Sequence, residues 1–144
     1  MTMISEPFRL LTLILPFTPI VLMVCPDPLR LTWVAGQAEW VVVIEPDAEI
    51  AAKHDGLGLR NVDVYCGSLD KFEESQEAWD WRLNFDLVIA EGVMGDDPEG
   101  ASKLLRSWAR WVLIFEPAGI DYRPLFGRIV VCHDGAEEFM LLGK

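Results

Sequence analysis

The chain has 144 residues, 51% of them hydrophobic, and a formal net charge of −11. This length suits one domain with a sizeable core, and the apolar fraction excludes a disordered chain. The acidic balance argues against nucleic-acid binding, because nucleic-acid binders gain most of their affinity from clustered Lys and Arg. The charge fits a soluble cytoplasmic protein, or one with a basic protein partner.

The N-terminal segment is almost wholly apolar over residues 10–25 and resembles a signal peptide or a membrane span. Pro16 and Pro19 divide it, and the apolar run is shorter than the roughly 20 residues of a spanning helix. The residues at its end are bulky, whereas a processing site needs small ones. We therefore expect no membrane segment here, but a short helix capped by Ser5 and a buried strand over 20–25.

The chain then alternates strand and helix signals. Asp27-Pro28 combines a cap with proline at the first helical position, which predicts a helix to about Ala38. The apolar run Val41–Ile44 predicts a strand buried on both faces of a parallel sheet. Asp47 can cap the following helix and Gly56 can end it.

The same rhythm continues to the C-terminus. We expect strands over 62–66, 85–90 and 111–115, a polar segment over 70–82 that is helical in its first half, and a helix capped by Asp97. Two strands over 127–132 and 138–142, around a turn at 133–136, predict an antiparallel hairpin. Repeated βαβ units imply a mostly parallel sheet with helices on both faces. Without a linker or repeat, residues 1–144 are expected to form a single α/β domain.

Glu45 stands at the carboxyl end of the predicted strand over 41–44, where open α/β sheets bind their ligands. In nucleotide-binding sheets an acid at this place accepts hydrogen bonds from ribose hydroxyls. Acids are also common at strand–helix turns for purely structural reasons. Asp27 has the same two interpretations: it is a helix cap, and it could bind a ligand ammonium group.

This order of elements resembles the class I S-adenosylmethionine (SAM)-dependent methyltransferase fold over nearly the whole chain. Residues 43–47 resemble the family's ribose-binding acid turn, which implies that Glu45 and Pro46 contact the cofactor. The resemblance implies a Rossmann-like three-layer sandwich, a mostly parallel sheet closed by a C-terminal antiparallel hairpin, and SAM as the cofactor.

Two further segments carry the resemblance. Residues 61–69 resemble the third strand and the turn that flanks the adenine, which implies contacts from Ser68 and Leu69. Residues 85–94 resemble the fourth strand and the loop beside the methyl group, which implies contacts from Glu91 and Gly92. Ser68 stands where the family usually has an acid.

The turn after the first strand departs from the family. A glycine-rich turn normally underlies the methionine portion of the cofactor, because glycine permits unusual backbone angles and close approach. Here Cys25, Pro26 and Asp27 take that place, and Pro28 follows. The two prolines fix the backbone and remove two N–H donors.

Catalytic constellations are few, so no catalytic residue is assigned. Glu91 could act as a base near a methyl acceptor, or be a solvated loop acid. His54 is expected near a helix C-terminus, where its charge would be favourable, and His133 in the hairpin turn. Neither histidine is paired with a nucleophile at a recognisable spacing.

The three cysteines, Cys25, Cys66 and Cys132, fall at or near predicted strand ends without a C-x-x-C spacing. We therefore expect no metal site. Their odd number, without a signal peptide, predicts reduced and mostly buried thiols.

Six tryptophans are many for this length, and Trp79-Asp-Trp81 lies in a polar, acidic segment. Exposed tryptophans often anchor interfaces, so this pair could meet a basic partner; alternatively, both rings pack under the sheet.

The sequence favours two functions over a third. The first is a small SAM-dependent methyltransferase-like protein that binds SAM or S-adenosylhomocysteine (SAH) at the carboxyl ends of the parallel strands and methylates a small molecule. The second is a non-catalytic binding or regulatory module of the same fold. A third is another enzyme acting on an adenosine-containing ligand.

Overall fold

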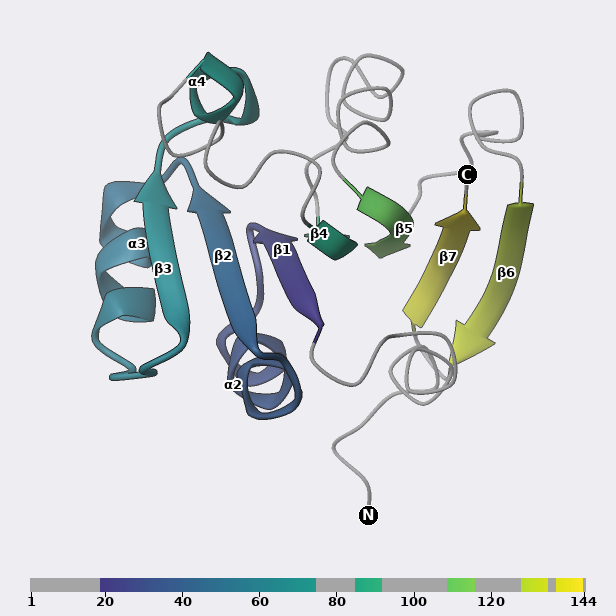
Figure 1. Cartoon of the computed structure of the whole chain (residues 1–144), viewed down its shortest axis with the longest axis horizontal. Helices are drawn as coiled ribbons and strands as arrows, with labels where there is room; N and C mark the ends of the chain where they lie inside the picture. The colour runs from purple at the N-terminus through teal and green to yellow at the C-terminus, as the bar shows by residue number, and fades with distance from the viewer. Residues whose placement is uncertain (1–18, 75–84, 92–108, 116–127, 135–136, 144) are drawn as a thin grey trace.

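In the described part of the chain, seven strands form one sheet in the order β3-β2-β1-β4-β5-β7-β6 (Figure 1). The computed structural model describes residues 19–74, 85–91, 109–115, 128–134 and 137–143. The strands are β1 (Ile20–Val24), β2 (Trp40–Glu45), β3 (Val62–Cys66), β4 (Phe85–Glu91), β5 (Ala109–Phe115), β6 (Arg128–Asp134) and β7 (Glu137–Gly143). The helices are α2 (Pro28–Gln37), α3 (Ala48–Asp55) and α4 (Leu69–Glu74).

The five strands from β3 to β5 are all parallel to their neighbours, which confirms the predicted α/β class. β7 pairs antiparallel with β5 and with β6. The strand β6 is longer than expected, since His133 pairs with Glu138 and Asp134 with Glu137. The prediction that His133 lies in a turn is therefore wrong: residues 133–134 continue the ladder, and only 135–136, between the two strands, lie outside the described residues.

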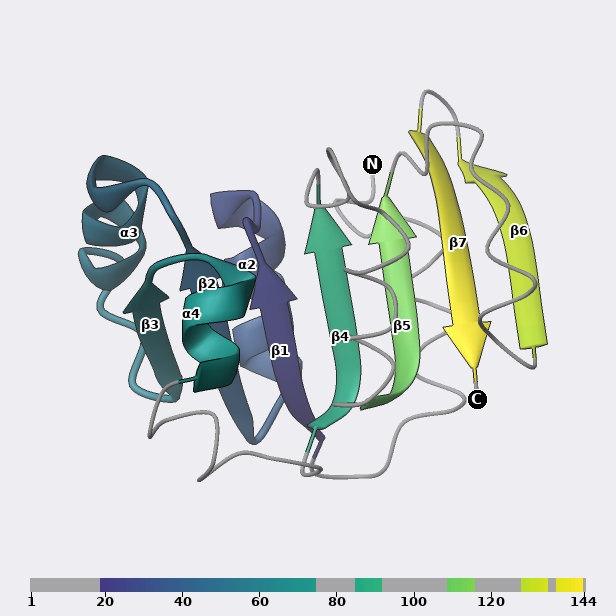
Figure 2. The same cartoon turned by 90° about the horizontal axis from the view of Figure 1, so that it is seen from above.

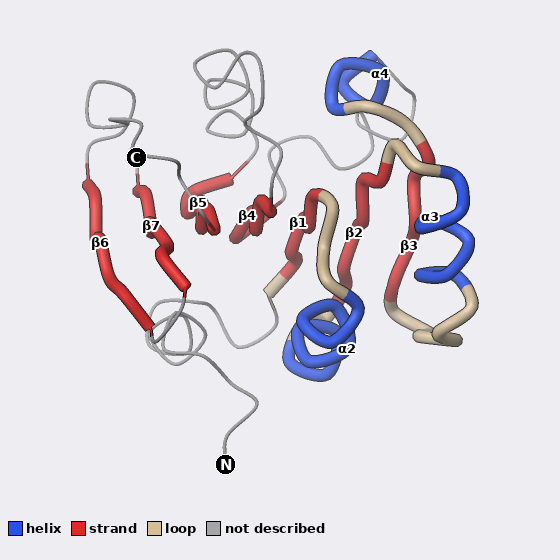
Figure 3. Tube along the Cα trace, turned by 180° about the vertical axis from the view of Figure 1, so that it is seen from behind, coloured by secondary structure: helices blue, strands red, loops and turns tan. Residues whose placement is uncertain are grey.

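The helices occupy both faces of the sheet. The crossovers through α2 and α3 run in the same direction, from β1 to β2 and from β2 to β3, so right-handed connections place both helices on one face. The next crossover turns back toward β4 and places α4 on the opposite face, as Figures 2 and 3 show.

Alternation along the strands divides the core between these two faces. Val41 and Val43 of β2 pack in one cluster with Leu31 and Val34 of α2. The intervening Val42 and Ile44 are also buried, on the other face. Burial on both sides accounts for the uninterrupted apolar run of β2. The run ends at Glu45, the last residue of the strand.

The predicted caps of α2 and α3 are confirmed. Asp27 accepts from the backbone N–H groups of Leu29 and Arg30, and α2 ends with Ala38 as its C-cap. Asp47 caps α3 in the same way, and Gly56 is its C-cap. Proline at the first position of α2 loses no hydrogen bond, since that N–H has no partner within a helix.

Several predictions fall outside the described residues. They are the helix capped by Ser5, the segment after Glu74 that holds Trp79 and Trp81, and the helix capped by Asp97. No described helix has the length and apolar character that crossing a membrane requires.

Candidate functional site

Four parallel strands, β3, β2, β1 and β4, end side by side and form what we call the carboxyl edge. It comprises Cys25 after β1, Glu45 at the end of β2, Cys66 to Ser68 at the end of β3, and Glu91 at the end of β4. Backbone hydrogen bonds tie the turns to β2. Cys25 N–H donates to the Ile44 carbonyl at 2.9 Å, and Gly67 N–H donates to the Glu45 carbonyl at 3.0 Å. The fold thus brings most of the predicted site residues to one edge.

The turn after β1 adopts a glycine-like backbone without a glycine. Cys25 has a φ of 52°, the only positive φ among non-glycine residues in the described chain. Its thiol is half-buried, Pro26 is buried, and Asp27 is exposed. The Asp27 carboxylate accepts from Leu29 N–H at 3.0 Å and Arg30 N–H at 3.4 Å. The turn therefore contains a residue with a positive φ, as a glycine turn would. Because this residue is Cys25 and not glycine, the conformation costs free energy.

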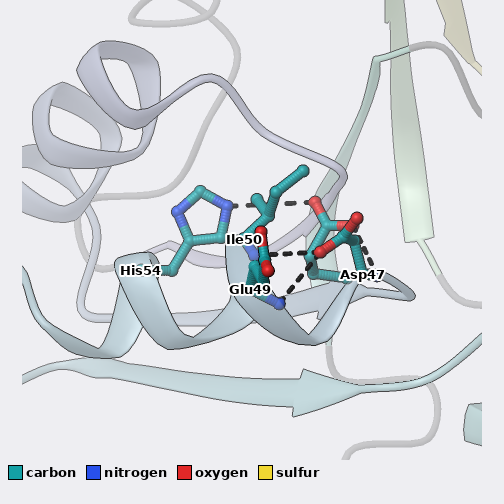
Figure 4. Close-up of polar contacts among 5 residues, drawn as sticks. Asp47, Glu49, Ile50 and His54 are labelled. Carbon is teal, nitrogen blue, oxygen red and sulfur yellow. Dashed lines mark hydrogen bonds and ion pairs between the residues drawn. The ribbon is translucent and has the colours of Figure 1, made fainter.

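Glu45 is a buried acid at the middle of the carboxyl edge. Its side chain is 7% exposed, whereas the following Pro46 is exposed. Oε2 accepts from the backbone N–H of Asp47 at 3.1 Å. Asp47 in turn accepts from Glu49 N–H at 2.9 Å and Ile50 N–H at 3.2 Å (Figure 4). The turn between β2 and α3 is therefore held by two successive carboxylates, of which only the first is buried.

His54 faces Glu45 from the last turn of α3. Its Nε2 lies 4.0 Å from Oε1 of Glu45, and its side chain is 0% exposed. Neither ring nitrogen has a hydrogen bond in the described part of the chain. The prediction that His54 lies near a helix C-terminus is confirmed, but its burial was not predicted. The signal was its spacing, since His54 follows the buried Ala51 by three residues and so shares its face.

The turn after β3 is built tightly around glycine. A Cβ at Gly67 would lie 2.7 Å from Cε2 of Tyr65, and the Tyr65 ring packs edge-on against Phe72 with centroids 5.2 Å apart. Ser68 Oγ accepts from the backbone N–H of Lys71 at 3.2 Å, so Ser68 caps the short helix α4 that begins at Leu69.

The fourth strand completes the edge beside β1. Ala90 pairs with Val24, so Glu91 follows at the level of Cys25, and its backbone pairs with Phe115 of β5. Gly92, the other residue predicted from this strand, lies outside the described residues.

Of the cysteines, Cys25 is half-buried and Cys66 is exposed. The prediction of mostly buried thiols is wrong for Cys66, because the edge strand β3 has no neighbour beyond it within the described sheet. The described residues contain no group of three or more His, Cys, Asp or Glu side chains placed to hold a metal ion.

Comparison with solved structures identifies the fold. An rRNA methylase from Streptococcus thermophilus matches with a TM-score of 0.66 at 16% identity, over 99% of each chain. The N-terminal domain of EvdMO1, solved with SAH bound, matches with a TM-score of 0.73 at 13% identity, over 96% of this chain and 79% of that one. TrmK of M. capricolum, in complex with SAH, matches with a TM-score of 0.62 at 11% identity, over 98% of this chain and 68% of that one.

A scan of family models and a search of curated proteins find no match. The structural likeness confirms that this chain has the class I SAM-dependent methyltransferase fold. At identities of 11–16% the likeness establishes the fold alone.

Proposed function

We propose that this protein binds SAM or SAH at its carboxyl edge and is a small methyltransferase acting on a small molecule. The observation that carries the proposal is Glu45, an acid on the last position of β2 in a sheet with the methyltransferase strand order. Two of the similar structures, EvdMO1 and TrmK, were solved with SAH. The antiparallel closure by β7 also supports the proposal, since the same closure is expected of this family.

The proposed cofactor fits the carboxyl edge at the ribose end. Glu45 Oε2 accepts from the Asp47 N–H, while Oε1 lies 4.0 Å from His54 Nε2. In the proposed complex, Oε1 would accept from the ribose hydroxyls. Ser68 and Leu69 would flank the adenine, with the Ser68 hydroxyl retaining its role as a cap.

The fit at the methionine end depends on the turn of Cys25, Pro26 and Asp27. The φ of 52° at Cys25 gives the chain the bend that glycine would otherwise supply. Asp27 would accept from the ammonium group of the methionine portion, while Glu91 and Gly92 would lie near the methyl acceptor. When bound, SAM would supply an electrophilic methyl group; the acid Glu91 could remove a proton from the acceptor.

A non-catalytic role is the second candidate, and one observation favours it. Pro26 and Pro28 remove two backbone N–H donors from the turn that would receive the methionine portion. Such a protein would act as a binding or regulatory module through an acidic surface that carries Trp79 and Trp81, meeting a basic protein partner. Trp79→Ala and Trp81→Ala would then weaken the complex and leave SAH binding unchanged.

We also propose a cytoplasmic location. Cys66 is an exposed cysteine outside any disulfide, and thiols stay reduced in the cytosol.

Calorimetric titration of the purified protein with SAM and with SAH tests the proposal. Micromolar binding of either ligand supports it, and screening of small-molecule methyl acceptors would follow. Absence of binding by a folded sample contradicts it and favours the non-catalytic role.

A further inference from the structure

His54 is a buried histidine that makes no hydrogen bond within the described part of the chain. Both ring nitrogens are buried, and no described residue forms a hydrogen bond with either of them. An unsatisfied buried polar group costs about 1–3 kcal/mol, so an apolar side chain would serve the packing of α3 better. The position of the ring therefore calls for an explanation other than packing.

The geometry of the neighbouring carboxylate supplies one. The two oxygens of Glu45 differ: Oε2 accepts from Asp47 N–H at 3.1 Å, while Oε1 faces His54 Nε2 at 4.0 Å. A hydrogen bond of N–H to oxygen spans about 2.7–3.2 Å. His54 Nε2 thus lies close enough to attract Glu45 Oε1, but the distance of 4.0 Å is too long for a hydrogen bond.

Building on the proposed function, we propose that His54 is a positioning residue that sets, through its charge, whether Glu45 Oε1 is available to a ribose. The neutral ring leaves Oε1 to the hydroxyls of the ligand. The protonated ring draws Oε1 toward α3, because charge-assisted hydrogen bonds are shorter and about twice as strong as neutral ones. Acidification favours the protonated form of an imidazole, so ligand affinity falls as the solution becomes acidic.

The other titratable groups around His54 lie on β2, on β3 and along α3 itself. On β2 the facing group is Glu45; on β3 it is Cys66, which pairs with Glu45 and shares its face. Asp63 and Tyr65 of β3 alternate onto the opposite face. The charged side chains of α3 and its cap are exposed: Asp47, Glu49, Lys53 and Asp55.

The test measures SAH affinity by calorimetry at about pH 5.5, 6.5 and 7.5 in three proteins. They are the unmodified chain, His54→Phe, which keeps a ring of similar size without its charge, and Lys53→Gln. The Lys53 variant is a matched control because it removes a cation from the same helical turn at an exposed position. Circular dichroism at each pH confirms folding, and His54→Gln replaces His54→Phe if the latter does not fold.

We expect the unmodified protein and Lys53→Gln to lose at least about five-fold in affinity between the highest and lowest pH, the lower end of ordinary coupling between sites. His54→Phe should bind almost equally across the range. A pH-independent affinity of the unmodified protein, or the same slope in His54→Phe, overturns the inference and leaves the proposed function standing. No binding by the unmodified protein at any pH overturns the proposed function, and the inference with it.

Discussion

Cys25 donates its backbone N–H to the carbonyl oxygen of Ile44 at 2.9 Å, and it does so with a φ of 52°. This bond extends the pairing of β1 and β2 by one residue and then turns the chain away toward α2. A non-glycine residue pays about 1–2 kcal/mol for this conformation. Cys25 is therefore a strained residue at the place where ligands meet this kind of sheet.

The strain at Cys25 predicts that glycine at this position gives a more stable protein than a larger, β-branched residue does. Cys25→Gly should be more stable than Cys25→Val by about 1–2 kcal/mol, because glycine adopts a positive φ freely and a β-branched residue does not. Urea denaturation of the two variants measures the difference. If the valine variant is equally stable, the turn relaxes on substitution and Cys25 is not strained.

The N-cap of α3, Asp47, is expected to contribute to the free energy of unfolding. Asp47→Ala should lower the free energy of unfolding by about 1 kcal/mol, because it removes the acceptor for the N–H groups of Glu49 and Ile50. Asp47→Asn, which keeps an acceptor oxygen, should lie close to the unmodified protein in the same denaturation experiment. Equal losses in both variants would show that the charge of Asp47, and not the hydrogen bonds, stabilises the helix.

Asn61 connects the end of α2 to the start of β3. Its Nδ2 donates to the carbonyl oxygens of Ala35 at 2.8 Å and Ala38 at 3.0 Å. Asn61→Asp keeps the shape and replaces both donors by acceptors, so we expect a loss of about 1–3 kcal/mol in the free energy of unfolding, measured by urea denaturation. The matched control is Arg60→Gln, a change at the preceding, exposed residue, which should have little effect. Unchanged stability of the Asn61 variant would mean that water replaces these bonds and that Asn61 does not anchor α2.

The strands and caps could be predicted because their signals are local. The run Val41–Ile44 is apolar on both faces, and only a strand buried on both sides needs such a run. Asp27 and Asp47 each precede a helix and accept the N–H groups that a helix leaves unpaired. These features depend on residues within a few positions of one another.

The details of the site depended on contacts between distant segments. The burial of His54 results from α3 packing against β2 and β3, and its approach to Glu45 joins a helix to a strand, which no helical spacing predicts. The exposure of Cys66 follows from β3 being the outermost strand. Cys25 has a positive φ, which a residue with a side chain rarely adopts, so its residue type gave no indication of this conformation.

The most direct test of the central claim compares SAH binding by the unmodified protein, Glu45→Gln and Glu49→Gln at about pH 7.5. Glutamine at position 45 keeps an acceptor for the Asp47 N–H, while position 49 is an exposed acid in the first turn of α3. We predict that Glu45→Gln weakens SAH binding at least about ten-fold, the lower end for a hydrogen bond to a charged group. Glu49→Gln should leave the binding unchanged. Equal affinities in all three proteins would contradict the claim that Glu45 holds the ribose.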